Sequence, residues 1–155
     1  MNTLVVYYSK FGNTQRVAEA IAEELQSVGP AGTLNADELR AEDLAGIELI
    51  VMGTPTHKMN LPDAVRPVLD SLPRRILRGV AVAAFDTSYE MSAFLARFTA
   101  AKKLNRKLRK LGGKRIVPPE TFHVAGHEGP LLDGELERAR RWAGLILGQL
   151  EPRST

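Results

Sequence analysis

A short polar segment at residues 9–14, SKFGNT, joins a run of β-forming residues to a segment with helical periodicity. It contains two hydroxyls, a carboxamide and a glycine that lets the backbone fold closely around a ligand. The first acidic side chain after it is Glu19, whereas Lys10 and Arg16 lie close to the positive end of the predicted helix. Two cations at that end are unfavourable unless an anion is bound. The segment therefore predicts a phosphate-binding loop, and the alternative is an ordinary turn capped by Asn13 or Thr14.

The elements that must position this loop alternate between strands and helices. Apolar runs predict strands at 3–8, 32–35, 47–53, 79–86 and within 114–125, where Pro118 and Pro119 interrupt the last one. Apolar residues at helical spacing predict helices near 17–28, 65–72, 94–111 and 136–150, with Asn60 and Asp133 as N-caps. We therefore expect a doubly wound α/β domain with a mostly parallel sheet. Its ligand site should lie beyond the carboxyl ends of the strands.

Length and composition narrow the class of protein further. With 155 residues, 44% of them hydrophobic and 25% charged, we expect a single domain over residues 1–155. The absence of cysteine excludes disulfides, thiolate metal sites and cysteine nucleophiles. No apolar run approaches the roughly 18 residues that span a bilayer, and the N-terminus does not resemble a signal peptide. We expect a cytoplasmic location and no membrane partner.

Basic side chains concentrate in the second half of the chain. Residues 1–90 carry 8 basic and 12 acidic side chains, whereas residues 91–155 carry 13 and 6. Nine of the basic residues fall in the segment 97–115, which contains no acid. The segment is interpreted either as a solvated helix face or as a docking site for an acidic partner protein. Nucleic acid is not indicated, because no base-stacking aromatics are interleaved with these charges.

Three stretches together resemble the flavodoxin family: VVYYSKFGNTQRVAEAIAEEL, IVMGTPTHKMNLPDAVRPVLDSL and VAVAAFDTSYE. The resemblance implies a flavodoxin-like, five-stranded parallel sheet of order 2-1-3-4-5, with helices on both faces and with FMN as the cofactor. It implies that the FMN phosphate is held by Ser9, Lys10, Phe11, Gly12, Asn13 and Thr14. It places Pro55, Thr56, His57, Lys58, Met59 and Asn60 on one side of the flavin ring. On the other side it places Asp86, Thr87, Ser88, Glu90 and Tyr89, with Tyr89 stacked on the ring.

The loop after the third predicted strand departs from the flavodoxin pattern. It has no aromatic side chain for the inner flavin face, only His57 and Met59, and no glycine between Pro55 and Leu61. A peptide flip on reduction would therefore cost more than in flavodoxins that have this glycine. Lys10 and Lys58 would favour the reduced, anionic flavin. We expect a less negative reduction potential and less of the one-electron-reduced form than in a typical flavodoxin.

Three functions are compatible with these residues. An electron carrier that docks to other redox proteins is favoured by the basic segment. An FMN-dependent NAD(P)H:quinone-type oxidoreductase is favoured by the Pro-Thr pair of the loop and by its missing glycine, whereas the short chain argues against it. A flavin-free, flavodoxin-like binding module is the third. No catalytic residue is proposed, and His123 and His127 are not read as a metal site, because they lie on an extended segment broken by glycine.

Overall fold

The computed structural model describes residues 1–56, 60–89 and 99–150 of the chain. Its parallel strands are β1 Thr3–Tyr7, β2 Ala31–Asn35, β3 Leu49–Pro55, β4 Ala81–Ser88, β5 Lys114–Arg115 and β6 Glu120–His123. The helices are α1 Asn13–Leu25, α2 Val65–Asp70, α3 Ala100–Lys110 and α4 Glu135–Leu150. Short 3-10 turns lie at Gln26–Val28, Ala36–Glu38 and Ala41–Leu44.

The sheet has the predicted strand order, β2-β1-β3-β4-β5, and β6 also pairs with β4. The fifth predicted strand is therefore two short strands along the same neighbour. Arg115 pairs with Val82 at the start of β4, and Glu120 pairs with Phe85 further along it. Pro118 and Pro119 lie in the gap, where residues without an N–H group cannot extend the ladder. The predicted interruption is confirmed.

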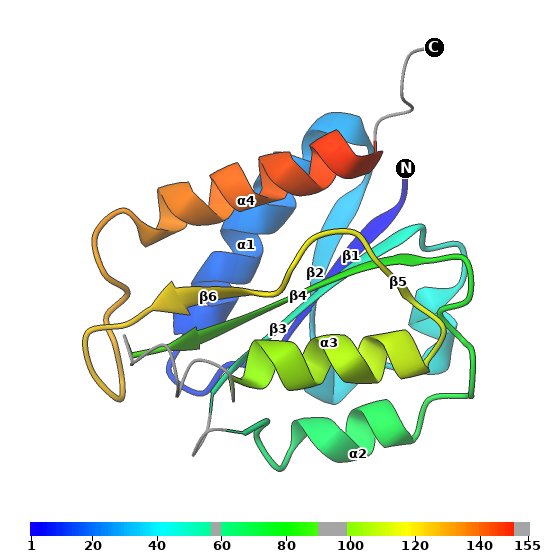
Figure 1. Ribbon diagram of the computed structural model, residues 1–155, viewed down its shortest axis with the longest axis horizontal. Coiled ribbons are helices and arrows are strands. Elements are labelled where there is room, and N and C mark those ends of the chain that lie inside the picture. Colours follow the sequence, from blue (N-terminus) through cyan, green and yellow to red (C-terminus); the bar gives the residue numbers. More distant parts are fainter. Residues whose placement is uncertain (57–59, 90–98, 151–155) are drawn as a thin grey trace.

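Helices cover both faces of the sheet (Figure 1). One core cluster contains Val5 of β1 with side chains from α1 and α4, and the other contains its neighbour Val6 with side chains from α2 and α3. Successive side chains of a strand point to opposite faces, so both faces of β1 are buried. This explains why the strands read as continuous apolar runs rather than as alternating ones.

Three aromatic rings fill the core beneath α4. The Phe85 ring meets the Phe122 and Trp142 rings at 5.9 and 6.0 Å between centroids, in edge-to-face geometry. Phe85 is paired in the sheet with Gly53, and its ring lies across that glycine. A Cβ atom at position 53 would come within 2.0 Å of the ring. Glycine is therefore required at position 53, near the end of β3, for β3 and β4 to pair around this ring.

The predicted helix boundaries need correction at several points. Asn60 does not cap α2, because the helix begins at Val65 and the Asn60 side chain accepts a hydrogen bond from the Leu61 N–H instead. Asp133 does not cap α4, because the Arg138 N–H donates to the Gly134 carbonyl, which makes Gly134 the N-cap. Helix α1 ends at Leu25, so Val28 lies beyond it. The predicted helical positions 94, 95 and 98 fall outside the described residues.

Among the described residues, no helix combines the length and the apolar character needed to cross a membrane.

Candidate functional site

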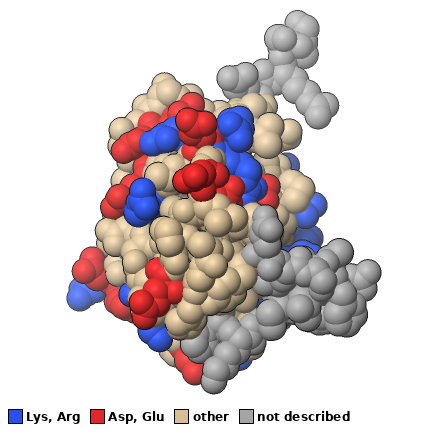
Figure 2. Space-filling model, turned by 90° about the vertical axis from the view of Figure 1, so that its left-hand side faces the viewer, with Lys and Arg blue, Asp and Glu red and all other residues tan. Residues whose placement is uncertain are grey.

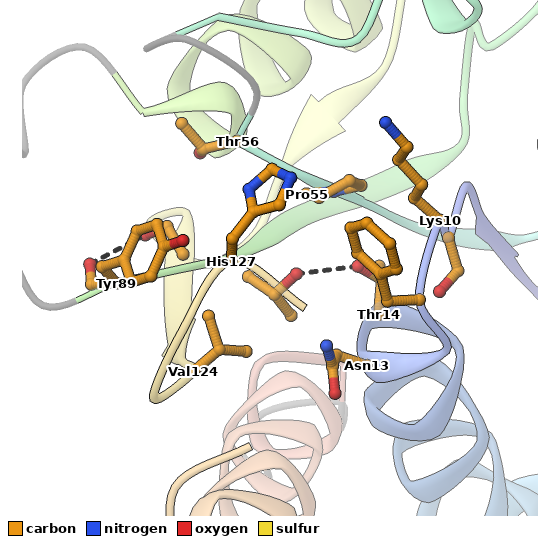
Figure 3. Close-up of a pocket in the computed structure, with 12 residues that line it drawn as sticks. Lys10, Asn13, Thr14, Pro55, Thr56, Tyr89, Val124 and His127 are labelled. Carbon is orange, nitrogen blue, oxygen red and sulfur yellow. Dashed lines mark hydrogen bonds between the residues drawn. The ribbon is translucent and has the colours of Figure 1, made fainter. Parts of the chain in front are cut away.

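A cavity opens beyond the carboxyl ends of β1, β3 and β4 (Figure 3). The chain leaves β1 toward β2 on one side, while β3 lies on the other, so the strand order reverses at this point. Such reversal points are where open α/β sheets bind ligands. The cavity encloses about 520 Å³, part of it open to solvent. It is lined by Ser9, Lys10, Phe11, Asn13, Thr14, Pro55, Thr56, Thr87, Ser88, Tyr89, Val124 and His127.

The amino end of α1 lines this cavity with Asn13 and Thr14. Gly12 is its N-cap at φ 90°, a conformation that favours glycine, and its N–H donates to Ser9 Oγ at 3.0 Å. Within the described residues, no side chain caps the helix and its first turn contains no acid. The first N–H groups of a helix have no partner inside it and carry a partial positive charge. This end of α1 is therefore built to accept an anion.

The predicted alternative, a turn capped by Asn13 or Thr14, is wrong because both side chains have other partners. The Thr14 side chain is buried, and its hydroxyl shares a 2.8 Å hydrogen bond with the Thr87 hydroxyl. The Asn13 amide donates to the Glu128 carbonyl at 3.1 Å. These contacts tie the first turn of α1 to β4 and to the loop before α4, so neither side chain caps the helix.

Two aromatic side chains of the cavity are unusually exposed. Phe11 is 41% exposed and Tyr89 is 44% exposed. Among the described residues only two other large hydrophobic side chains, Val28 and Leu145, are exposed to this degree, and neither lines the cavity. Flat aromatic faces beside an anion site suit a ligand that has both a planar ring system and a phosphate. Figure 2 shows this end of the molecule, where a broad area has no charged side chain among the residues drawn in colour.

Asp86 stands behind the cavity rather than in its wall. The residue is fully buried, and its Oδ2 accepts hydrogen bonds from the Thr56 hydroxyl at 2.5 Å and from the Ala101 N–H at 3.2 Å. The Ala100 N–H in turn donates to Thr56 Oγ1 at 3.0 Å. Asp86 thus links the loop after β3 to the amino end of α3 and is not among the residues that line the cavity, so its contact with FMN stays a prediction.

Burial raises the pKa of Asp86 above its ordinary value, and the hydrogen bonds that its carboxylate accepts from the Thr56 hydroxyl and the Ala101 N–H oppose this shift. A raised pKa in the folded state means that stability falls as pH rises from the unfolded-state pKa through the folded one. Asp86→Asn keeps an acceptor for Thr56 and Ala101 and removes the charge. We expect its stability relative to wild type to increase from about pH 4 upward and then level off.

Asp86→Leu is the matched control, because it removes the acceptor as well as the charge. It leaves two buried donors unpaired, and we expect a loss of about 2–4 kcal/mol at pH 7. Urea unfolding of the three proteins between pH 4 and pH 8 measures both effects. Equal destabilisation by Asn and Leu would contradict the assigned hydrogen bonds.

The structure brings together ten of the residues that the sequence predicted for the site. They are Ser9, Lys10, Phe11, Asn13, Thr14, Pro55, Thr56, Thr87, Ser88 and Tyr89, and Gly12 shapes the loop from its backbone. Asn60 does not line the cavity, and its side-chain oxygen accepts the Leu61 N–H. The predicted site residues His57, Lys58, Met59 and Glu90 lie outside the described residues. Contact of any of these residues with FMN stays a prediction.

Two residues that line the cavity, Val124 and His127, were not predicted from the sequence. Both come from the segment between β6 and α4, which reaches the site because β6 ends at the same edge of the sheet as β4. The His127 ring meets the Phe11 ring at 5.3 Å between centroids, with an angle of 66° between their planes. The signal that could have revealed them is the parallel direction of the last strand, which places the residues after it beside the other strand exits.

Fold and site together define a doubly wound α/β protein with a cavity at its switch point, lined by the amino end of α1 and by two exposed aromatic side chains. The similarity of this chain to known proteins shows its family. The family model described as flavodoxin matches residues 5–142. The chain is 30% identical over 157 residues to a flavodoxin of Clostridium saccharobutylicum, covering 97% of this chain and 98% of that one. The chain belongs to the flavodoxin family, whose members are FMN-binding electron-transfer proteins.

Two further similarities bear on the fold and on the alternative function. The solved structure of oxidised flavodoxin 2 from Bacillus cereus superposes with a TM-score of 0.79 at 18% identity, covering 97% of this chain and all of that one. An NAD(P)H dehydrogenase (quinone) of Geobacter sulfurreducens is 32% identical over 97 residues. This match covers 46% of the present chain and 48% of the dehydrogenase.

Proposed function

We propose that this chain binds FMN in the cavity at the switch point and carries electrons between redox proteins. The observation that carries the proposal is the uncapped amino end of α1, with Lys10 and Arg16 near it and no acid in its first turn. The two exposed aromatic side chains of the same cavity, Phe11 and Tyr89, support a flat ring system as the other half of the ligand. Bound FMN would supply the electron-accepting and electron-donating chemistry.

The chain's own residues divide the work of binding. The backbone of 9–14, with the Ser9 hydroxyl and the cations Lys10 and Arg16, would hold the phosphate. Pro55 and Thr56 from β3, and Thr87, Ser88 and Tyr89 from β4, would flank the remainder of the ligand. The position of Thr56 is fixed from behind, because its hydroxyl both donates to Asp86 and accepts from Ala100. The residues that would flank the ligand are thus positioned by the ends of β3 and β4.

The proposed partner is an acidic redox protein that docks over the cavity and along α3. This helix begins beside the cavity, at the Ala100 N–H that contacts Thr56. Its exposed side chains include Lys102, Arg106, Arg109 and Lys110, whereas Lys107 is paired with Asp70 at 3.0 Å. A field of this kind speeds association with an oppositely charged partner and weakens with salt.

A titration of the purified protein with FMN tests the proposal. We expect stoichiometric quenching of flavin fluorescence at micromolar protein. Riboflavin should bind at least about tenfold more weakly, because it lacks the phosphate that α1 would hold. Absence of quenching with either flavin would leave the flavin-free binding module as the function.

Anaerobic addition of NADPH to the FMN-loaded protein separates the carrier from the quinone oxidoreductase. The similarity to the Geobacter quinone dehydrogenase, together with the Pro55-Thr56 pair, is the observation that favours the enzyme. For a carrier, the flavin absorbance should persist with NADPH and bleach with dithionite. Rapid bleaching by NADPH alone would replace the carrier with the enzyme.

A further inference from the structure

The segment between β6 and α4 is a closed loop rather than an open connection. Val124 forms an antiparallel bridge with Leu131, the Ala125 N–H donates to the Pro130 carbonyl at 2.8 Å, and the Leu132 N–H donates to the His123 carbonyl at 3.0 Å. At its tip the Gly129 N–H donates to the Gly126 carbonyl at 3.0 Å. These hydrogen bonds fold residues 124–132, here called the β6–α4 loop, back on themselves.

The β6–α4 loop packs directly on the amino end of α1. The Glu128 carbonyl accepts from the Asn13 amide at 3.1 Å. Gly129 lies so close to the same amide that a Cβ atom there would come within 2.7 Å of it. The edge-to-face contact between His127 and Phe11 is the third link. The loop is therefore fitted to the segment that is proposed to hold the phosphate.

His127 extends from this loop into the cavity, which is also lined by Thr14 and Pro55 (Figure 3). The residue is exposed, and within the described part of the chain neither ring nitrogen has a hydrogen-bond partner. Of the residues that the structure describes, the charged or titratable groups around it are Lys10, whose Nζ lies 5.5 Å from the centroid of the Phe11 ring, Tyr89 at the end of β4, and Glu128 on its own loop. Its imidazole thus has two free nitrogens beside the anion site.

Resting on the proposed binding of FMN, we propose that His127 is a cofactor-binding residue of this chain and acts on the phosphate monoester. The imidazole donates a hydrogen bond to the phosphate, and in its protonated form it adds a positive charge beside the dianion. Imidazole changes its charge between about pH 5 and pH 8, so this contribution is larger at low pH. Among the described residues, the three flavin loops predicted from the sequence contain no histidine.

The test compares dissociation constants of wild type and His127→Gln, at pH 6.0 and pH 8.5, with FMN and with riboflavin. Both proteins are compared at the same pH, so the titration of the phosphate in free FMN affects their dissociation constants equally and drops out of the ratio. For FMN we expect His127→Gln to bind about tenfold more weakly at pH 6.0 and within about threefold of wild type at pH 8.5. For riboflavin the ratio should stay near one at both pH values. Because His127 is exposed, the substitution should leave the fold intact.

Imidazole NMR resonances give a second readout that does not depend on redox activity. Addition of FMN should shift the His127 resonances and raise the pH at which they titrate, because the dianion stabilises the imidazolium. His123, which does not line the cavity, is the internal control. The assignment to His127 is overturned if the ratio of the two proteins' dissociation constants for FMN does not change with pH. It is also overturned if the His127 resonances do not move in FMN-bound protein. Either result leaves the proposed FMN binding unaffected. A wild-type protein that binds no FMN overturns both proposals.

Discussion

Ser9→Asp is expected to weaken FMN binding at least about 100-fold while the cofactor-free protein stays folded. The Ser9 hydroxyl accepts the Gly12 N–H at 3.0 Å, so a carboxylate at this position would sit beside the proposed phosphate. Repulsion between two charges about 4 Å apart is worth several kcal/mol near a protein surface, and about 1.4 kcal/mol corresponds to a factor of ten. The cofactor-free protein should gain about 0.3–1 kcal/mol, because the carboxylate faces the positive end of an uncapped helix.

Ser9→Asn is the matched control, because it has nearly the same shape as aspartate without the charge. We expect its FMN affinity to lie much closer to that of wild type than to that of Ser9→Asp. Fluorescence titrations give the affinities, and urea unfolding of the cofactor-free proteins gives the stabilities. If Asp and Asn weaken FMN equally, the effect is steric and the phosphate does not lie at the amino end of α1.

Gly53→Ala is expected to cost about 3 kcal/mol or more of unfolding free energy. The added Cβ would lie 2.0 to 2.4 Å from three atoms of the Phe85 ring. That ring is fully buried and held between the Phe122 and Trp142 rings, so it has little room to move away. Relief of the overlap would have to come from β3 or β4, whose ends carry residues of the cavity, so FMN affinity should fall as well.

Gly144→Ala is the control for replacing a glycine by alanine. Apart from the adjoining residues and the backbone of α4 itself, no atom lies within 4 Å of a Cβ built at Gly144, so we expect a gain of about 0.5–1 kcal/mol. Combining Gly53→Ala with Phe85→Leu should cost less than the sum of the two single changes, because the shorter side chain removes the overlap. Strict additivity would mean that the ring does not oppose the new methyl group.

Much of this fold could be predicted from the chain, because a strand buried on both faces requires a continuous apolar run. The apolar runs around Val5, Val51 and Ala83 correctly predicted three strands. The residues at and just after the ends of these strands were predicted for the site, and they make up most of the cavity lining. The helix caps were less predictable. Asn60 has the right residue type for a cap, but its side chain bonds to the adjacent Leu61 N–H, a choice that depends on the path of the loop.

The remaining parts of the site depend on tertiary packing that no local pattern contains. Asp86 lies near the carboxyl end of β4, as the predicted ligands Thr87 and Ser88 do, yet its carboxylate is buried and accepts hydrogen bonds from Thr56 and from the Ala101 N–H of α3. His127 is separated from Phe11 by more than a hundred residues, and only the direction of β6 brings the two rings together. A single histidine in a glycine-rich loop carries no sign of such a neighbour.

The division of the last strand into β5 and β6 also limits the backbone hydrogen bonds that this edge of the sheet can offer to another chain. An outermost strand with free N–H and C=O groups is a template on which a second chain can add its own strand and begin to aggregate. Here the outer side offers only two residues in β5 and four in β6. Pro118 and Pro119 separate the two stretches and have no N–H group to donate. An incoming strand would find no continuous ladder to extend, which protects this border against fibril-like self-association.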